Sequence, residues 1–491
     1  MSSPVEAAEK QPLVSATEIH DAAEPRRRVR HDADVVIVGA GVLGCALAVA
    51  LGRQGRRVLL LERSLKEPDR IVGELLQPGG VRALEQLGLS ECLEDIDSIR
   101  VKGYDVIYYG EQVAIPYPPT DGVSSPAPEG RSFHHGRFVM KLRAAAMAEP
   151  NVTVVETTAT SLITAPDSTQ VIGVECAANG GQDGDGGTRH YYAPLTVAAD
   201  GYASKLRKEH HPYTPQVKSK FWALELIDAE LPMPYHGHVV LGDGPPVLLY
   251  QIGTHETRVL VDIPENLPSA SVQNGGVKGH LRNTVLPALP ACVQPSFRAA
   301  IENGRLRSMP NSFLPPATNR TPGLVILGDA LNMRHPLTGG GMTVAFNDVV
   351  VLRDLLSPEK VPDLSDTRKV LRQMSAFHWQ RKSFSSVINI LAQALYSLFA
   401  AEDERLKTLK HGCFRYFQLG RIDGPVGLLA GLIRRPFVLF GHFFSVAFLS
   451  IWILLREEPL YRLPVTLAHS LAVLWTSCVV IFPYIFAEMK S

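Results

Sequence analysis

A glycine-rich turn near the start of the chain has the residue types and spacing of a dinucleotide-binding site. An apolar run ends in a Gly-x-Gly-x-x-Gly pattern formed by Gly39, Gly41 and Gly44. Gly39 permits a tight turn, Gly41 lets the backbone approach a pyrophosphate, and Gly44 lets helix and strand pack closely. The following helix, with Val42 and Leu43 in its first turn, would offer N–H groups and a positive dipole end to the phosphates.

An acidic residue follows at the distance that this pattern requires. The second apolar run, Val58–Leu61, ends in Glu62, which is placed to accept hydrogen bonds from a ribose diol. A glycine motif alone can be an ordinary turn. The two flanking strands and the acid favour a dinucleotide site.

Two later motifs favour FAD over NAD. A buried-strand pattern leads into Gly328-Asp329, and Asp329 can hydrogen-bond a ribityl or ribose hydroxyl. The glycines of 339–341 precede a helix pattern over 343–356, whose N-terminus can stabilise negative charge on a reduced flavin or its pyrophosphate. Another strand ends in Asp200-Gly201. Each Gly-Asp or Asp-Gly pair alone can be a plain turn, but the order of the three motifs indicates a flavin site.

The elements that position these residues predict an α/β fold with a Rossmann-type FAD-binding domain, a β-sheet substrate domain and a C-terminal helical membrane hairpin. Residues 179–187 are expected to form a flexible, glycine-rich hairpin tip. The expected parts are a disordered tail (1–31), a discontinuous FAD-binding domain (32–110, 131–215 and 305–360), the substrate-side sheet domain (216–304), a helical pocket region (361–435) and membrane-associated helices (436–491).

Two long apolar runs predict the membrane hairpin. The runs Pro436–Leu455 and Leu463–Ala487 are each long enough to cross a hydrocarbon core of ~30 Å. The alternative is a helical hairpin buried in a soluble core. Hydropathy does not decide whether the hairpin spans the bilayer or dips into one leaflet.

Composition excludes several other classes. The 491 residues carry 49 basic and 49 acidic side chains, so no excess of positive charge recommends a nucleic-acid partner. The six cysteines are scattered without metal-ligand spacing, which predicts neither a metal site nor a disulfide framework. No nucleophile–His–acid set stands out.

Several longer stretches resemble the squalene epoxidases, within the FAD-dependent aromatic-hydroxylase type of monooxygenase. They lie at 62–80, 133–138, 307–310 and, the longest, 328–346. The resemblance covers roughly residues 32 to 491. It implies monotopic anchoring on the endoplasmic reticulum with a cytosolic catalytic body. It also implies FAD contacts from the 39–44 turn, Glu62, Arg63, Arg70, Arg143 and Asp329, with Met342 near the ring.

The expected reaction is the epoxidation of squalene to 2,3-oxidosqualene with O₂ in sterol synthesis. Because only one Gly-x-Gly-x-x-Gly site is present, electrons from NADPH are expected to arrive through a separate diflavin reductase, unless NADPH visits transiently. Gln77 and Tyr104 are the candidate catalytic residues that would hold the reactive oxygen near the ring. A purely structural hydrogen bond is the alternative for both.

A long apolar substrate needs an apolar path. Residues 384–400 have helical apolar spacing, which is consistent with either core packing or a substrate wall. His442 lies inside the first apolar run, where it is either a functional group or a neutral packed histidine. The residues expected to line the substrate path are Tyr104, Leu337, Leu395, Phe399 and His442.

Two other functions remain open from the sequence. A flavin hydroxylase of another lipid, such as a quinone precursor, would share the flavin motifs. A non-catalytic, FAD-binding escort of lipids would keep Glu62 and Asp329, but the intact glycine run before Met342 argues against it.

Overall fold

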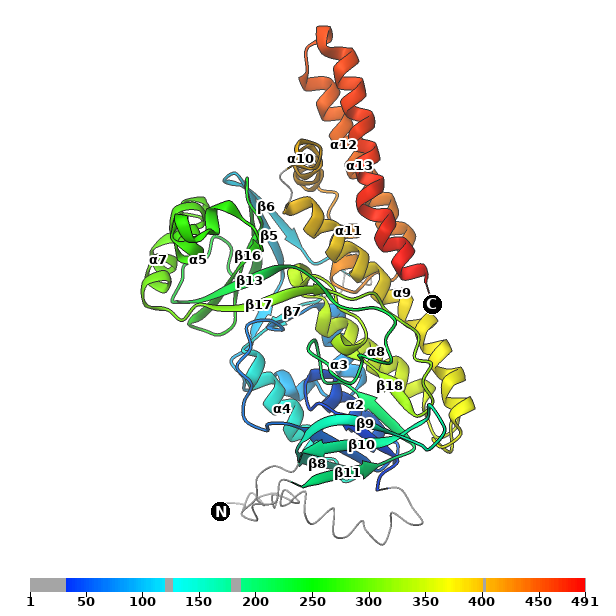
Figure 1. The fold of residues 1–491 in the computed structure, drawn as a ribbon. Helices are drawn as coiled ribbons and strands as arrows, with labels where there is room; N and C mark the ends of the chain where they lie inside the picture. The colour runs from blue at the N-terminus through cyan, green and yellow to red at the C-terminus, as the bar shows by residue number, and fades with distance from the viewer. Residues whose placement is uncertain (1–31, 120–126, 178–186, 401–402, 491) are drawn as a thin grey trace.

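The computed structural model describes residues 32–119, 127–177, 187–400 and 403–490. The expected tail, 1–31, and nearly all of the expected glycine-rich hairpin tip lie outside the described residues. Figure 1 shows a body of sheets and helices from which the helix pair α12–α13 projects.

A five-stranded parallel sheet forms the base of the body. Its strands are short and almost wholly buried, because both faces are covered, so their sequences are near-continuous Val and Leu runs. In order across the sheet they are β18 (Leu324–Ile326), β12 (Leu195–Ala198), β1 (Val35–Val38), β2 (Val58–Glu62) and β8 (Val152–Glu156).

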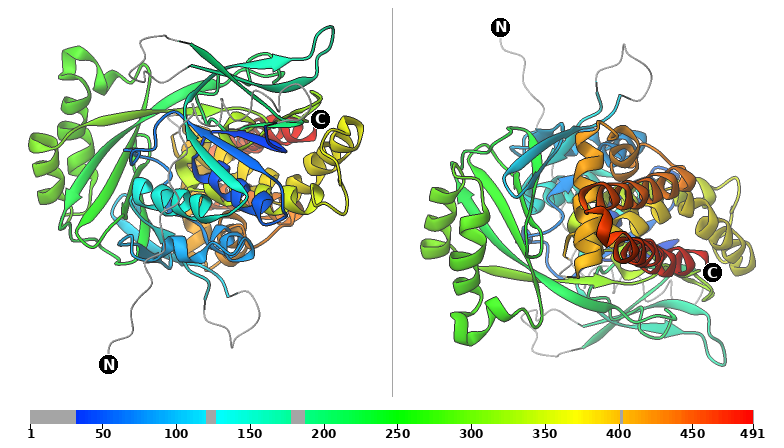
Figure 2. Two further views of the ribbon diagram at one scale, coloured as in Figure 1. Left: turned by 90° about the horizontal axis from the view of Figure 1, so that it is seen from below. Right: turned by 90° about the horizontal axis from the view of Figure 1, so that it is seen from above.

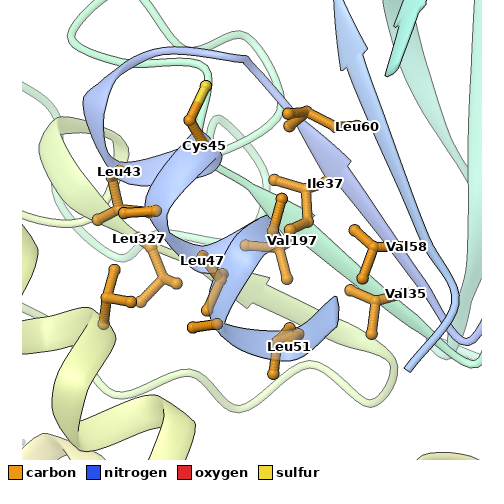
Figure 3. Close-up of a cluster of buried hydrophobic side chains, with 14 of the residues drawn as sticks. Val35, Ile37, Leu43, Cys45, Leu47, Leu51, Val58, Leu60, Val197 and Leu327 are labelled. Atoms are coloured by element: carbon orange, nitrogen blue, oxygen red, sulfur yellow. The ribbon is translucent and has the colours of Figure 1, made fainter. Parts of the chain in front are cut away.

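Helix α2 (Val42–Gly52) is the central helix on one face of this sheet. It packs between α4 (His135–Ala148) and α8 (Gly341–Leu355), and α8 also contacts α3 (Pro78–Gln86). Figure 3 shows the apolar side chains of α2 meeting those of β1, β2 and β12. This core confirms the predicted Rossmann-type α/β fold.

Two three-stranded sheets flank the base. One is antiparallel and packs against β2 and β12; it contains β11 (Thr188–Tyr192), β10 (Val171–Ala177) and β9 (Thr158–Thr164). The other contains β3 (Leu75–Leu76), β7 (Gly130–Ser132) and β4 (Ile99–Val101).

A seven-stranded sheet forms the second half of the body. Its strands, in order, are β17 (Arg307–Phe313), β13 (Gln216–Ile227), β16 (Glu256–Pro264), β15 (Val247–Gln251), β14 (His236–Leu241), β5 (Gly103–Tyr108) and β6 (Glu111–Pro116). Helices α5 (Gly276–His280) and α7 (Gln294–Asn303) cover one face (Figure 1), and the short α6 (Leu286–Ala288) packs into the same apolar cluster.

The structure differs from the expected domain boundaries at this sheet. Strands β5 and β17 fall in segments expected to belong to the FAD-binding domain, yet both hydrogen-bond into the seven-stranded sheet. Strand β5 pairs in parallel with β14, and β17 pairs with β13. Strands β5 and β14 are more than a hundred residues apart in sequence, and β13 and β17 are about ninety residues apart. No local sequence pattern can therefore predict these pairings.

The C-terminal part is helical. Its helices are α9 (Thr367–Phe399), α10 (Glu404–Gln418), α11 (Asp423–Leu429), α12 (Pro436–Glu457) and α13 (Leu463–Met489). Helices α12 and α13 are each long and apolar enough to cross a membrane. They stand side by side next to α9, as the view from above shows (Figure 2), and most of their apolar side chains are uncovered by the body. These helices agree with the predicted C-terminal hairpin.

Candidate active site

The geometry of the turn between β1 and α2 explains why glycine occupies each of its three motif positions. Gly39 has φ 105°, and a Cβ there would lie 2.6 Å from the carbonyl oxygen of Ala199. A Cβ on Gly44 would lie 1.9 Å from the carbonyl oxygen of Gly39. A Cβ on Gly41 would meet nothing within 4 Å. Two of these glycines therefore serve packing, whereas Gly41 keeps open a space that a ligand can fill.

Glu62 and Arg143 hold this turn from behind. The Glu62 carboxylate accepts a hydrogen bond from Ala40 N at 2.8 Å, and Arg143 Nε donates to Ala40 O at 2.9 Å. Arg143 and Glu62 are themselves 3.6 Å apart. Both residues were expected to contact the cofactor; neither lines the cavity, and both are placed to fix the backbone that does.

The turn opens on a large cavity between the two main sheets. Its empty volume is about 1600 Å³, part of it open to solvent. Six of the expected cofactor residues line it: Gly41, Val42, Leu43, Arg70, Asp329 and Met342. Arg63 is exposed, and Gly39 and Gly44 lie within the packed turn.

Two helices begin at this cavity without a side-chain cap. Gly41 precedes α2 and Gly340 precedes α8, and neither first turn contains an acidic residue. Their N–H groups and positive dipole ends therefore favour anionic groups in the cavity. With the open space at Gly41, these features fit a dinucleotide such as FAD.

Tyr104 and Gln77 meet at one wall of the cavity. Gln77 Nε2 donates hydrogen bonds to the Tyr104 hydroxyl and, at 2.8 Å, to the carbonyl oxygen of Thr338, while Tyr117 donates to Gln77 Oε1 at 2.7 Å. Gln77 is fully buried behind Tyr104, which lines the cavity. Burial raises the pKa of Tyr104, so its hydroxyl keeps its proton.

The structure adds an ionic cluster to this wall that the sequence did not indicate. The Glu74 carboxylate accepts two short hydrogen bonds from Arg258, each 2.9 Å, and a third at 3.2 Å from the Tyr250 hydroxyl. Burial alone would lower the pKa of Arg258, but the negative charge of Glu74 raises it above its usual range. Glu74 and Tyr250 line the cavity. The cluster joins the 62–80 stretch, which contains Glu74, to the seven-stranded sheet, which contains Tyr250 and Arg258.

Two further cavity residues also escaped sequence analysis. His135 and Arg334 line the cavity, and both are buried. Arg334 lies within the long 328–346 motif, close to Asp329 in sequence. Sequence analysis could have singled it out as a positively charged residue of that motif to which no role was given. The nonlocal packing that buries it is not visible in the sequence.

A second, apolar cavity lies among α9, α10, α11, α12 and α13. Its empty volume is about 650 Å³, and its lining side chains are aliphatic or aromatic except for Cys413 and His442. His442 Nδ1 lies 2.7 Å from the Tyr416 hydroxyl. The expected substrate residues are thus divided: Tyr104 and Leu337 line the first cavity, Leu395 and His442 line the second, and Phe399 is packed in the apolar core that contains Leu337.

Comparison with known families matches both halves of the chain. The FAD-binding domain model matches residues 32–240, and the squalene epoxidase model matches residues 192–468. The squalene epoxidase erg1 of Aspergillus fumigatus is 71% identical over 95% of this chain and 96% of that protein. The chain belongs to the squalene epoxidase family. The resemblance seen in the sequence is confirmed.

More distant relatives agree with this family. The squalene monooxygenase of Mus musculus is 46% identical over 94% of this chain and 78% of that protein. Among solved structures, PqsL from Pseudomonas aeruginosa, a probable FAD-dependent monooxygenase, has a TM-score of 0.62 at 22% identity over 76% of this chain and 98% of its own. The flavin-dependent brominase Bmp2 has a TM-score of 0.65 at 15% identity over 84% and 98%. These two likenesses show the fold.

Proposed function

We propose that this chain is an FAD-dependent monooxygenase that converts squalene to 2,3-oxidosqualene with O₂ and electrons derived from NADPH, a step in sterol biosynthesis. The observation that carries the proposal is the match of nearly the whole chain to curated squalene epoxidases, on a fold whose cavity fits FAD. FAD, when bound, supplies the activation of O₂ and the transfer of one oxygen atom to an alkene.

The residues of the chain would bind and orient this cofactor. The open backbone at Gly41 and the N-terminus of α2 would receive the pyrophosphate, with Val42 and Leu43 beside it. Asp329 would accept from a ribityl or ribose hydroxyl. Glu62 and Arg143 would act through the turn that they hold. Arg63, Arg70 and Met342 complete the expected contacts.

Tyr104 and Gln77 would position the reacting oxygen. Burial keeps the Tyr104 hydroxyl protonated, and the hydrogen bonds of Gln77 fix its place. An alkene requires no acid or base for its activation, so the remaining wall has to exclude water. Apolar side chains such as Leu248, Leu260 and Leu337 line the same cavity and would do so.

Squalene would enter through the second cavity. Its apolar lining matches a hydrocarbon, and it lies against α12 and α13, which would take up substrate from lipid. Leu395 and His442 would contact the chain in passage, and Phe399 and Leu337 would form the apolar core between the two cavities. Residues 361–435 supply much of this path, as the proposed pocket region.

The cellular setting is the finer part of the proposal. The helices α12 and α13 would anchor the enzyme in the membrane of the endoplasmic reticulum, with the catalytic body in the cytosol. A separate NADPH-dependent diflavin reductase would reduce the bound FAD, since the chain carries a single Gly-x-Gly-x-x-Gly turn.

A reconstituted reaction tests the function. The full chain in detergent micelles is reduced anaerobically, exposed to O₂ with and without squalene, and analysed for 2,3-oxidosqualene. We expect squalene-dependent product and, under NADPH, fast turnover only with the reductase. Bound flavin without product would favour an escort protein, and product only from another lipid would favour a hydroxylase. Rapid reduction by NADPH alone would contradict the need for a reductase.

A further inference from the structure

A chain of four buried side chains joins the last turn of α13 to the wall of the flavin cavity. Asn389 of α9 donates to Glu488 Oε1 at 2.7 Å and to Asn332 Oδ1 at 2.9 Å. Arg334 donates to the same Asn332 Oδ1 at 2.8 Å and to its carbonyl oxygen at 3.0 Å. All four residues are at most 8% exposed, and Arg334 lines the cavity.

The positive charges of the arginines and the lysine near these four side chains are incompletely balanced without Glu488. Arg381 forms a two-point pair with Asp348, both bonds 2.9 Å, so that carboxylate is already engaged. The guanidinium of Arg334 has only Asn332 as a hydrogen-bond acceptor among the described residues. Glu488 faces Arg334, Arg381 and Lys382 electrostatically. Asp329 and Asp348 also act on these cations, so Glu488 supplies a third negative charge to a cluster that contains the buried Arg334 and Arg381 and the half-buried Lys382.

The position of Glu488 is unfavourable for a helix that only anchors. It is 6% exposed and lies one residue before the end of α13, where the helix dipole disfavours an acid. An anchor requires apolar side chains and no buried carboxylate. The described end of the chain lies against α9 (Figure 1), where Lys382 Nζ also donates to Lys490 O at 3.2 Å. The acid is thus placed for the body rather than for lipid.

We propose that Glu488 is a positioning residue for Arg334, which it holds in the cavity wall through Asn389 and Asn332. Arg334 lines the cavity, where its positive charge can attract a negatively charged ligand. Its Nε is buried and has no hydrogen-bond partner among the described residues, so Asn332 alone orients the guanidinium. The docking of the hairpin thereby sets the affinity of the cavity for FAD. This inference rests on the proposed location of FAD.

A double-mutant cycle on FAD affinity tests the coupling. The full chain in micelles is stripped of flavin and titrated with FAD, with flavin fluorescence as the readout. The variants are Glu488→Leu, Arg334→Gln and the double variant. Glu457→Leu, an exposed acid at the far end of α12, is the matched control. Glu488→Gln is included as a variant that preserves folding, because its amide oxygen still accepts from Asn389.

We expect Glu488→Leu to weaken FAD binding about three- to tenfold, and Glu488→Gln about two- to threefold. The double variant should bind no more weakly than Arg334→Gln alone, within about twofold. The control should bind as the wild type does, and all variants should still float with lipid vesicles. Additive losses, or wild-type affinity in both Glu488 variants, would overturn the coupling. Failure of the wild type to bind FAD would instead overturn the proposed cofactor site.

Discussion

At the scale of single residues, Tyr104 is the group that connects the cavity to the buried amide of Gln77. Its hydroxyl lies between Gln77 Nε2 and the carbonyl oxygen of Thr338, which is 3.4 Å away. Gln77 keeps hydrogen bonds to Thr338 and Tyr117 when the hydroxyl is removed. A role in the reaction can therefore be separated from a role in the fold.

Tyr104→Phe should lower kcat by about tenfold, which corresponds to the loss of one hydrogen bond of ~1.4 kcal/mol in the transition state. FAD content and the melting temperature should stay close to those of the wild type. Steady-state kinetics with squalene and the reductase provide the measurement. Tyr109→Phe, which removes an exposed hydroxyl bound to Asp243, is the control. An unchanged kcat in Tyr104→Phe would leave this tyrosine a structural role only.

His135 gives the fold a dependence on pH. Burial and the nearby Arg70 lower its pKa to about 4, and the N-terminus of α4, which it opens, also disfavours a positive ring. In the unfolded chain its pKa is about 6.5, so the unfolded state takes up a proton first as pH falls. Stability associated with the neutral ring is therefore complete above about pH 6.5 and is lost progressively towards pH 4.

In the wild type, the free energy of unfolding should fall as the pH is lowered from about 6.5 to about 4. His135→Gln should make this fall smaller by on the order of 3 kcal/mol. The fall should not vanish, because His238 and His378 also have a pKa of about 4. Denaturant titrations followed by tryptophan fluorescence at pH 7, 6, 5 and 4 measure the free energy of unfolding across this window. His255→Gln removes an exposed histidine whose pKa Asp228 raises, and it should not flatten the curve. Parallel curves for His135→Gln and the wild type would contradict the assignment.

At the scale of elements, different glycines of the turn between β1 and α2 serve the packing of the fold and the binding of the ligand. Gly44→Ala places a Cβ 1.9 Å from a backbone oxygen and should destabilise the fold, whereas Gly41→Ala places one in open space. We expect Gly41→Ala to keep the melting temperature of the flavin-free chain but to weaken FAD binding at least tenfold, because the methyl group occupies the approach of the pyrophosphate. Thermal unfolding and FAD titration of both variants distinguish the two effects. Equal losses of stability would contradict this division.

Local patterns explain which elements were predictable from the sequence. The fingerprint, the apolar strands and the two long helices each have a short-range signal, and the structure has all of them. Strands β5 and β17 were assigned to another part of the chain, because their partners are distant in sequence. Likewise, only tertiary packing shows that Glu62 and Arg143 hydrogen-bond the backbone of the turn at Ala40, and their contact with the cofactor stays a prediction.

At the scale of the whole molecule, the hairpin presents a large apolar surface outside the body. Among its exposed side chains are Phe437, Phe448, Trp452 and Trp475. Such a surface is unfavourable in water and is covered when it enters lipid. The body, in contrast, has its own apolar cores between its sheets and the helices that pack on them.

Replacing Phe437, Phe448, Trp452 and Trp475 together with Gln should release most of the protein from washed membranes. The FAD content should stay unchanged, since none of these side chains lines either cavity. The apparent KM for bilayer-held squalene should rise at least severalfold while kcat changes little. Flotation assays and kinetics with vesicles measure both effects. Replacing exposed Trp379 of α9 by Gln is the control for loss of a surface aromatic. Continued pelleting of the fourfold variant would show that another surface binds lipid.

The order of strands in the parallel sheet has a consequence for how the enzyme is made. Strand β18 lies at one edge and joins only β12, more than a hundred residues earlier in the chain, and α8 follows β18 directly. Closing so long a loop is slow, and its entropic cost is recovered only when the distant pairing forms. A nascent or truncated chain covering residues 32–240 would hold the Gly39–Gly44 turn and Glu62 but half of the pocket for FAD. Flavin capture is therefore expected only after β18 has joined β12 and α8 has packed against α2, so a chain stalled before this point should bind flavin weakly.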